Sequence, residues 1–517
     1  MQQVIRGLVV ASWVIVVTSA DASAATCESL SALKLRDVAI TQAQVVPAGL
    51  FVLPQGVSST AGDAPLLRDL PAFCRVAATL KPSRDSHIEI EVWLPIDNWN
   101  GKFLAVGNGG WAGRISYAPA GRSLIDGVRR GYATASTDTG HKTPPGQAGG
   151  EAHFAIGHPE KLIDLGYRAV HEMTITSKAL IAQFYGRAPG LSYWNGCSTG
   201  GRQGLVEAQR YPADFDGIVA GAPANYWTHL HTWDLSVAVP ALNSPASLIP
   251  RAKLTLLNNA VLAACDASDG VKDGVLNNPP VCAFNPATLR CRVGDTSDCL
   301  TAPQLESVAR VYSSARTTSG QEIFPGKDPG SEANWTSVSS DARRPVDVAL
   351  GSFQVAYADP DWDWKTFNVD RDMKVVDERL GPVLNAIDPD LSAFKARAGK
   401  LILFHGWNDT LISPRNTVNY YASVVTKMGS PQDSWLRLFM APGMNHCNGG
   451  VGPDRADWLA ALEQWREFNK APGQILATRA NEDRTTTARP LCPYPQVAAY
   501  KGSGSTDDAA NFVCRDK

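Results

Sequence analysis

The sequence contains three side chains of the types that nucleophilic acyl transfer needs. Ser198 stands at the centre of a Gly-x-Ser-x-Gly motif at residues 196–200. Asp409 and His446 come later in the chain, each in the loop directly after an apolar run. An imidazole that takes the hydroxyl proton, and is itself oriented by a carboxylate, turns serine into a strong nucleophile. We therefore predict that Ser198 is a nucleophile, Asp409 its acid and His446 its base.

Each of these residues has a plainer interpretation when it is taken alone. Gly-x-Ser-x-Gly motifs also occur in ordinary glycine-rich loops, Asp409 could cap the helix after it, and His446 could be a loop histidine. Cys197 could itself be the nucleophile, although an even number of cysteines in an exported chain argues against a free thiol. The agreement of place and order among the three residues favours the triad.

The segments around Ser198 have the order strand, sharp turn, helix. Residues 191–197 are an apolar run rich in aromatic side chains, and residues 202–210 have helical periodicity. A turn in this context exposes the serine hydroxyl at the carboxyl edge of a sheet. The backbone amide of Thr199, directly after the serine, is then predicted to stabilise an oxyanion.

A second glycine-rich turn, at residues 107–110, follows a predicted strand at residues 102–106. Hydrolases with this type of nucleophile turn take their second oxyanion-hole amide from such a turn, upstream of the serine. The amide of Asn108 or of Gly109 is the predicted donor. The plain alternative is a tight turn without a catalytic role.

Further strands and helices alternate along the chain. Apolar runs predict strands, and amphipathic periodicity predicts helices. The predicted strands are residues 88–94, 132–137, 217–223, 400–405 and 435–440, and the predicted helices are residues 165–184, 413–428 and 456–468. This alternation favours a largely parallel sheet that is covered on both faces. Together with the nucleophile turn, it predicts an α/β-hydrolase fold with a large inserted lid domain.

The lid is predicted at residues 225–398, where tryptophans are scattered among Pro, Asp and Ser and the alternation of strand and helix stops. The two parts of the hydrolase core are then residues 26–224 and 399–517. Residues 26–82 are predicted to be irregular. The tail is predicted to be a loop closed by a disulfide rather than a disordered end.

Composition and the first residues indicate an exported globular protein. Of the 517 residues, 44% are hydrophobic and 19% charged, and the net charge of −2 gives no electrostatic case for nucleic acid or an anionic membrane as a partner. Residues 1–25 are predicted to be a signal peptide, with Arg6, an apolar run and a small-residue cleavage site. The apolar run is short for a membrane span, so a retained anchor is the less favoured alternative. We expect a secreted or periplasmic protein.

The cysteines agree with export. All lie beyond the predicted cleavage site, and their number is even. The sequence has no Cys-x-x-Cys pair of the kind that binds zinc. They are Cys27, Cys74, Cys197, Cys265, Cys282, Cys291, Cys299, Cys447, Cys492 and Cys514. Cys197 directly precedes the predicted nucleophile, and Cys447 directly follows the predicted base. If Ser198 and His446 are within hydrogen-bond reach, these two neighbours are close enough for a disulfide that holds the two loops in register.

The arrangement Gly-Cys-Ser-x-Gly-Gly, followed by a later Asp and a His-Cys pair, resembles the tannase and feruloyl esterase family. Residues 196–201, 217–223, 442–450 and 489–495 look like segments of that family. The resemblance implies the disulfide pairs Cys27 with Cys74, Cys197 with Cys447, Cys265 with Cys282, Cys291 with Cys299, and Cys492 with Cys514. Sequence alone could not choose this pairing.

The resemblance also implies a structural calcium site in the lid, remote from the triad. Asp266, Asp269 and Asp273, with the carbonyls of Val271 and Val275, are hard oxygen ligands on a glycine-containing loop. The spacing differs from an EF-hand, so on the residues alone a solvated acidic turn is an equal alternative. No organic cofactor is expected.

The function that follows is a secreted serine carboxylic-ester hydrolase that forms an acyl-enzyme. The resemblance implies esters of aromatic acids, either feruloyl and other hydroxycinnamoyl esters or galloyl esters. One alternative is a hydrolase of mono(2-hydroxyethyl) terephthalate-type monoesters, in which Arg343 and Arg344 could meet the substrate carboxylate. A solvated arginine pair is the more favoured interpretation of those two residues. An alternative of another class is an inactive, calcium-stabilised binding protein on a hydrolase scaffold.

Overall fold

The structure is a computed structural model that describes residues 25–54, 57, 63–117, 122–144, 151–481 and 485–516. Nearly all of the predicted signal peptide lies outside these residues. The fold is built around a nine-stranded sheet with the strand order β1-β2-β3-β5-β4-β6-β7-β10-β11. Its strands are β1 (Val38–Val46), β2 (Phe73–Leu80), β3 (Ile88–Pro95), β4 (Lys102–Val106), β5 (Ala133–Thr137), β6 (Leu191–Cys197), β7 (Gly217–Gly221), β10 (Lys400–Gly406) and β11 (Leu436–Ala441).

The sheet is parallel from β5 through β11 and antiparallel from β1 to β5. Parallel strands end at the same edge, so the loops after β4, β6, β10 and β11 gather there. These loops carry the predicted site residues. This part of the molecule confirms the predicted α/β-hydrolase fold.

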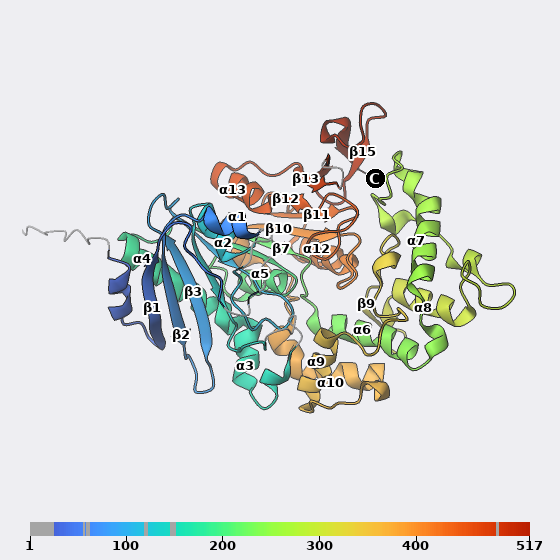
Figure 1. The fold of residues 1–517 in the computed structure, drawn as a ribbon, viewed down its shortest axis with the longest axis horizontal. Helices are drawn as coiled ribbons and strands as arrows, with labels where there is room; N and C mark the ends of the chain where they lie inside the picture. Colours follow the sequence, from blue (N-terminus) through green and yellow to red (C-terminus); the bar gives the residue numbers. More distant parts are fainter. Residues whose placement is uncertain are drawn as a thin grey trace, which may run out of the picture.

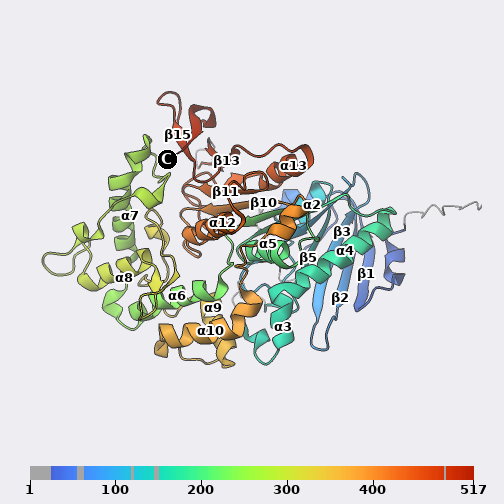
Figure 2. The same cartoon turned by 180° about the vertical axis from the view of Figure 1, so that it is seen from behind.

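Helices cover both faces of the sheet (Figures 1 and 2). On one face α4 (Ala169–Tyr185), α5 (Thr199–Arg210) and α12 (Pro414–Met428) pack in one apolar core with alternate strand residues such as Trp194 and Leu403. On the other face α2 (Leu124–Arg129) and α13 (Trp458–Phe468) pack with the strand residues that point the opposite way, such as Tyr193 and Phe404. The period-two alternation of buried strands between two helix layers explains why both sets of side chains are apolar. The short helices α1 (Asp63–Arg68) and α3 (Pro159–Ile163) complete this half.

The chain between β7 and β10 adds no strand to the nine-stranded sheet. It forms a helical layer with its own apolar core, at the right of Figure 1. Its helices are α6 (Trp227–Leu242), α7 (Arg251–Cys265), α8 (Ala302–Tyr312), α9 (Asp347–Tyr357), α10 (Val369–Leu384) and α11 (Ser392–Ala396), with a small hairpin of β8 (Ala315–Arg316) and β9 (Glu322–Phe324). We call residues 225–398 the lid.

The prediction that residues 26–82 are irregular is wrong, because this segment contains β1 and β2. Most residues of β1 are half-buried or exposed, and its register with β2 shifts between Ile40 and Gln42. The edge position and the bulge remove the regular apolar alternation by which strands are recognised. The predicted helix at residues 165–184 begins later, because Asp164–Arg168 form a π-helical turn ahead of α4.

The tail carries more regular structure than the predicted loop. A three-stranded sheet is formed by β12 (Arg455–Ala456), β13 (Ile475–Ala480) and β14 (Thr486–Leu491), and β15 (Val497–Tyr500) pairs with β16 (Phe512–Arg515). The disulfide between Cys492 and Cys514 closes this last hairpin. These strands lie beside the lid near the C-terminus in Figure 1.

Candidate active site

Ser198 lies in a strained turn between β6 and α5. Its φ of 64° and ψ of −123° are unfavourable for a residue with a Cβ. The turn is possible because glycines stand two positions away on either side: a Cβ at Gly196 would lie 2.4 Å from the carbonyl oxygen of Gly200. The side chain of Ser198 is only partly buried. This is the geometry of a nucleophile turn, which presents a hydroxyl at the edge of the sheet.

Asp409 follows β10 and is completely buried, yet both of its oxygens are fully hydrogen-bonded. Oδ1 accepts the backbone N–H groups of Leu411, at 2.8 Å, and Ile412, at 2.9 Å. Oδ2 lies 2.6 Å from Nδ1 of His446 and 3.0 Å from Nε2 of His405. Burial alone would raise the pKa of Asp409, but the charge of His446 and the hydrogen bonds from both imidazoles hold it well below its usual range. Asp409 is therefore a permanent anion near neutral pH.

The contact with Asp409 decides the tautomer of His446. A carboxylate oxygen can only accept, so Nδ1 of His446 carries the hydrogen and Nε2 has the free lone pair. The side chain of His446 is 18% exposed, whereas that of Asp409 is not exposed at all. The imidazole thus stands between a buried acid and open space, as a general base must.

A disulfide links the nucleophile loop to the base loop. Cys197 and Cys447 are bonded, with their Cα atoms 6.0 Å apart. The residues next to them in the chain are Ser198 and His446, so two loops that are 250 positions apart in sequence meet at this bridge. The structure therefore brings the three predicted triad residues to one place.

The glycine-rich turn after β4 packs directly on the nucleophile turn. The N–H of Gly200 donates to the carbonyl of Asn108 at 2.8 Å, and the hydroxyl of Thr199 donates to the carbonyl of Gly110 at 2.6 Å. A Cβ at Gly107 would lie 2.6 Å from Cα of Gly200, so only glycine allows this approach.

The two predicted alternatives for the second oxyanion donor differ in this geometry. The N–H of Asn108 donates to Oε1 of Gln203 at 3.1 Å and is therefore already in use. Within the described part of the chain, no hydrogen bond uses the N–H of Gly109 or of Thr199. Gly109, rather than Asn108, remains the candidate partner of Thr199.

All five predicted disulfides are present. Besides the bridge between Cys197 and Cys447, the pairs are Cys27 with Cys74, Cys265 with Cys282, Cys291 with Cys299, and Cys492 with Cys514. No cysteine of the described chain is free, which excludes Cys197 as a thiol nucleophile in this structure.

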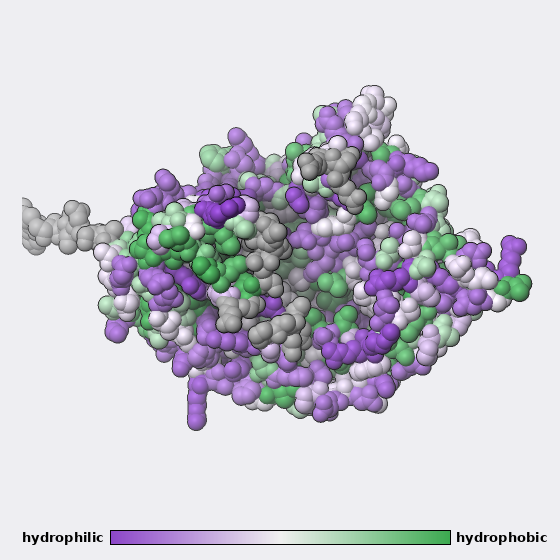
Figure 3. Space-filling model, in the orientation of Figure 1, coloured by the Kyte–Doolittle hydropathy of each residue, from purple (hydrophilic) through white to green (hydrophobic). Residues whose placement is uncertain are grey.

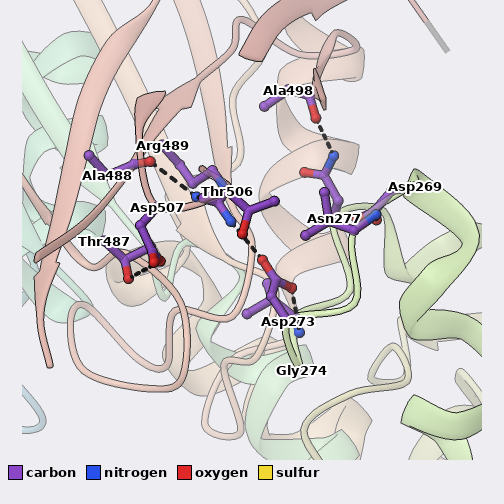
Figure 4. A network of polar contacts seen from close by, with 12 residues as sticks. Asp269, Asp273, Gly274, Asn277, Thr487, Ala488, Arg489, Ala498, Thr506 and Asp507 are labelled. Carbon is purple, nitrogen blue, oxygen red and sulfur yellow. Dashed lines mark hydrogen bonds and ion pairs between the residues drawn. The ribbon is translucent and has the colours of Figure 1, made fainter. Parts of the chain in front are cut away.

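The acidic loop of the lid lies against the C-terminal strands (Figure 4). Asp266 accepts the N–H of Gly274 at 3.0 Å, and Asp273 pairs with the guanidinium of Arg489 at 2.7 Å. Burial raises the pKa of Asp269 to about 6; the N–H of Val271 opposes this shift, and the charges of Asp273 and Asp266 add to it.

Oxygen donors of this kind are the ligands that a hard cation prefers, and a bound positive charge would relieve the repulsion among the carboxylates. No three His, Cys, Asp or Glu side chains of the described residues form a group that could hold a metal ion. An ion at this loop would therefore need backbone carbonyls, such as those of Val271 and Val275, among its ligands.

A cavity of about 210 Å³ lies between this loop, the C-terminal strands and the core. Asp269 and Asp273 line one side, Arg489 and Phe512 another, and Trp407 belongs to the core side. Asn277 of the loop donates to the carbonyl of Ala498 at 2.6 Å and ties the loop to β15. The cavity thus lies where the lid loop, the C-terminal strands and the hydrolase core meet.

Three charged or titratable groups near Asp409 were not found from the sequence. His405 is the second last residue of β10, and its position four residues before Asp409 was the only available signal. Asp234 on α6 and Lys327 after β9 are both buried and interact electrostatically with Asp409. No local pattern marks these two residues, because the lid brings them to the site from a distance in the chain.

The arginine pair of the lid lies at the surface. Arg343 donates to the carbonyls of Ser340 and Ala342, and Arg344 pairs with Asp347 at 2.6 Å with 61% of its side chain exposed. These contacts favour the interpretation as solvated residues over that of a carboxylate-binding pair.

None of the described helices has both the length and the apolar character needed to cross a bilayer. Figure 3 shows polar side chains over much of one face, with apolar side chains gathered near the β1 to β3 end of the sheet. Val45 on β1, and Leu50 and Val52 soon after it in the chain, are exposed apolar residues.

Comparison with known proteins matches the chain to one family. The family model for tannase and feruloyl esterase covers residues 74–515. An uncharacterized esterase of Xanthomonas campestris pv. campestris is 39% identical over 96% of this chain and 92% of that protein. Mono(2-hydroxyethyl) terephthalate hydrolase of Piscinibacter sakaiensis is 33% identical over 86% of this chain and 85% of that protein.

A solved structure agrees. Feruloyl esterase B from Aspergillus oryzae superposes with a TM-score of 0.84 at 29% identity, covering 95% of this chain and 99% of that chain. The fold, the family match and these relatives agree with one another, and the chain therefore belongs to the tannase and feruloyl esterase family of carboxylic ester hydrolases.

Proposed function

We propose that the protein is an exported serine esterase that cleaves esters of aromatic acids, of the feruloyl or other hydroxycinnamoyl type or of the galloyl type. The observation that carries the proposal is the bridge from Cys197 to Cys447, which joins a strained Ser198 to a His446 that already bonds Asp409. The five disulfides support export, because such bonds persist in oxidising compartments.

The proposed reaction begins with general base catalysis. Nε2 of His446 takes the hydroxyl proton as Oγ of Ser198 attacks the ester carbonyl carbon. The imidazolium that forms is stabilised by Asp409 through the existing contact at Nδ1. The N–H groups of Thr199 and Gly109 hold the carbonyl oxygen as it gains negative charge.

The tetrahedral intermediate collapses when His446 gives its proton to the leaving alcohol. The acyl group then remains on Ser198 as an ester. A water molecule, deprotonated by His446, attacks this acyl-enzyme and releases the aromatic acid, and Ser198 regains its proton.

Hydrolysis assays with three esters test the proposal. Methyl ferulate, methyl gallate and mono(2-hydroxyethyl) terephthalate are offered to the wild type and to Ser198→Ala under oxidising conditions. We expect at least one methyl ester to be cleaved, and kcat to fall by about 10⁶-fold in the variant. Thr255→Ala, an exposed lid substitution, is the matched control. A folded wild type that cleaves none of the three, and whose Ser198 resists a serine-modifying phosphonate, would overturn the proposal.

The terephthalate-type monoester is the second candidate substrate, because the mono(2-hydroxyethyl) terephthalate hydrolase of Piscinibacter sakaiensis is 33% identical to this chain. A carboxylate on the substrate needs a cationic partner, and Arg344 is the residue that the sequence suggested. Its exposed pairing with Asp347 gives no support for a part in binding that carboxylate. Selectivity between acidic and neutral esters that changes in Arg344→Ala would favour the monoester.

A structural calcium ion is also part of the proposal. Its proposed ligands are Asp266, Asp269 and Asp273 with the carbonyls of Val271 and Val275. The three carboxylates do not by themselves form a metal-binding group in the described chain, so the loop would have to shift for all of them to bind the ion. When bound, the ion would supply positive charge that neutralises the carboxylates of the lid loop. It would take no part in ester cleavage.

A further inference from the structure

A second imidazole touches the acid of the proposed triad. His405 is fully buried, and its Nε2 lies 3.0 Å from the same Oδ2 of Asp409 that His446 contacts. On its other side, Nδ1 of His405 lies 2.7 Å from the hydroxyl of Thr417 on α12. A side chain with no exposed surface does not reach the substrate, so any part that it plays must act through Asp409.

The neighbours of His405 decide its tautomer. Nε2 faces two acceptors, Oδ2 of Asp409 and the carbonyl of Ile412 at 3.2 Å, so Nε2 carries a hydrogen. Nδ1 meets a hydroxyl, which can donate. The neutral ring with hydrogen on Nε2 therefore satisfies every partner without adding a charge.

Titratable groups act on Asp409 from several elements: His405 from β10, His446 after β11, Asp234 from α6 and Lys327 after β9. Nζ of Lys327 is buried 4.6 Å from the Trp233 ring and has no hydrogen-bond partner within the described chain. The tautomer of His405 therefore follows from its hydrogen-bond partners and not from these charges.

We propose that His405 is a positioning residue: its neutral ring, held by Thr417, donates Nε2–H to Oδ2 of Asp409 and keeps that oxygen aimed at Nδ1 of His446. The inference rests on the proposed function of Ser198, Asp409 and His446. With two backbone donors on Oδ1 and two imidazole donors on Oδ2, the carboxylate has all four of its acceptor positions filled. Loss of one donor lets the carboxylate turn and leaves its charge less neutralised.

Two substitutions at position 405 separate the loss of the N–H donor from a change in side-chain volume. His405→Phe fills the space without a donor, and His405→Gln restores an N–H donor that cannot ionise. We expect kcat of His405→Phe on the best ester to fall by about 10- to 100-fold with KM unchanged, because the base is no longer held in register. His405→Gln should recover kcat to within about threefold of the wild type.

The pH profile of kcat/KM distinguishes positioning from a purely structural contribution. Without the His405 donor, Asp409 is more basic and holds the His446 imidazolium more tightly, so the acidic limb moves to higher pH in His405→Phe. It should stay at the wild-type position in His405→Gln. A structural effect would lower the melting temperature and leave the limb in place.

Thr417→Val and Thr417→Ser give a second test, which can still be made if His405→Phe does not fold. The Val variant should lose kcat severalfold, and the Ser variant, which keeps the hydroxyl, should not. If the wild type cleaves no ester, the proposed function fails before this inference is reached. If the wild type is active, any of three outcomes would overturn this inference and leave the proposed function standing. Folded His405→Phe could keep the wild-type kcat and acidic limb, or Thr417→Val could keep them. Alternatively, His405→Gln could lose as much kcat as His405→Phe.

Discussion

Two buried aspartates of this protein have opposite electrostatic states because their hydrogen bonds differ. Asp409 receives two donors on each oxygen, and its pKa is held well below the usual range despite burial, chiefly by the charge of His446 and the bond from His405. Asp138 receives donors on one oxygen only, the N–H groups of Glu89 and Gly140 on Oδ1. Its Oδ2 is buried without a hydrogen-bond partner in the described chain.

The incomplete satisfaction of Asp138 predicts a dependence of stability on pH. Burial raises the pKa of Asp138 to about 8, and its two backbone hydrogen bonds oppose the shift. An acid whose folded pKa is raised contributes stability that is fully present below its unfolded pKa of about 4 and is lost as pH rises towards the folded pKa. Asp138→Asn keeps the Oδ1 acceptor but cannot ionise. Its free energy of unfolding should therefore gain on that of the wild type by up to about 1.4 kcal/mol per pH unit between pH 4 and 8.

Urea unfolding at pH 5, 6, 7 and 8 measures this difference. Asp97→Asn, at an exposed position, is the control for the loss of one negative charge. A gap between Asp138→Asn and the wild type that is the same at pH 5 and pH 8 would contradict the predicted ionisation.

Three parallel strands explain why residues far apart in the chain form one site. The strands β6, β10 and β11 end at the same edge of the sheet, and β7 lies between β6 and β10. Ser198 follows the first, Asp409 the second and His446 the third. The strands fix the edge but not the loops, and the bridge from Cys197 to Cys447 supplies the remaining constraint between the outer two loops.

Removal of that bridge should separate catalysis from folding. Cys197→Ala/Cys447→Ala frees the loops that carry Ser198 and His446, and kcat should fall by about 100-fold through misplacement alone. The bridge closes a loop of 250 positions, so its loss should also cost about 5 kcal/mol of unfolding free energy in the chain-entropy model. Ester hydrolysis and urea unfolding measure the two effects on the same preparation.

The pair Cys492→Ala/Cys514→Ala is the matched control. It removes a bridge that closes only 22 positions in the C-terminal hairpin, and its stability cost should be about 3 kcal/mol with kcat largely retained. Equal losses of kcat in the two double variants would show that the central bridge has no special part in positioning.

Local patterns predicted the elements that carry the site, and distant contacts explain what they missed. The strand and helix around Ser198, and the strands before Asp409 and His446, have strong apolar periodicity, so their type and order could be predicted. The edge strand β1 lacks a strong periodicity because few of its side chains are fully buried and a bulge interrupts it. Lys327 and Asp234 reach Asp409 only through the packing of the lid, for which the chain carries no short-range signal.

At the scale of the molecule, the lid and the C-terminal strands are joined at the acidic loop. Asp273 pairs with Arg489 of β14, and Asn277 bonds the carbonyl of Ala498 in β15. Val271 packs in one apolar cluster with Phe512 of β16. An ion that orders this loop would therefore stabilise the contact between the lid and the C-terminal strands, which are far apart in the sequence.

Chelation should consequently lower the stability of the whole molecule. Without a cation, Asp269 faces the charges of Asp273 and Asp266 in a partly buried position, and the loop that holds Arg489 loosens. We expect EGTA to lower the melting temperature of the wild type on the order of 5 °C, and added calcium to restore it. Asp269→Asn should melt lower and no longer respond to EGTA, whereas Asp298→Asn, an exposed acid of the same lid, should respond as the wild type does. A wild-type melting temperature that EGTA leaves unchanged would mean that the loop is a solvated acidic turn, and that Arg489 alone supplies its positive charge.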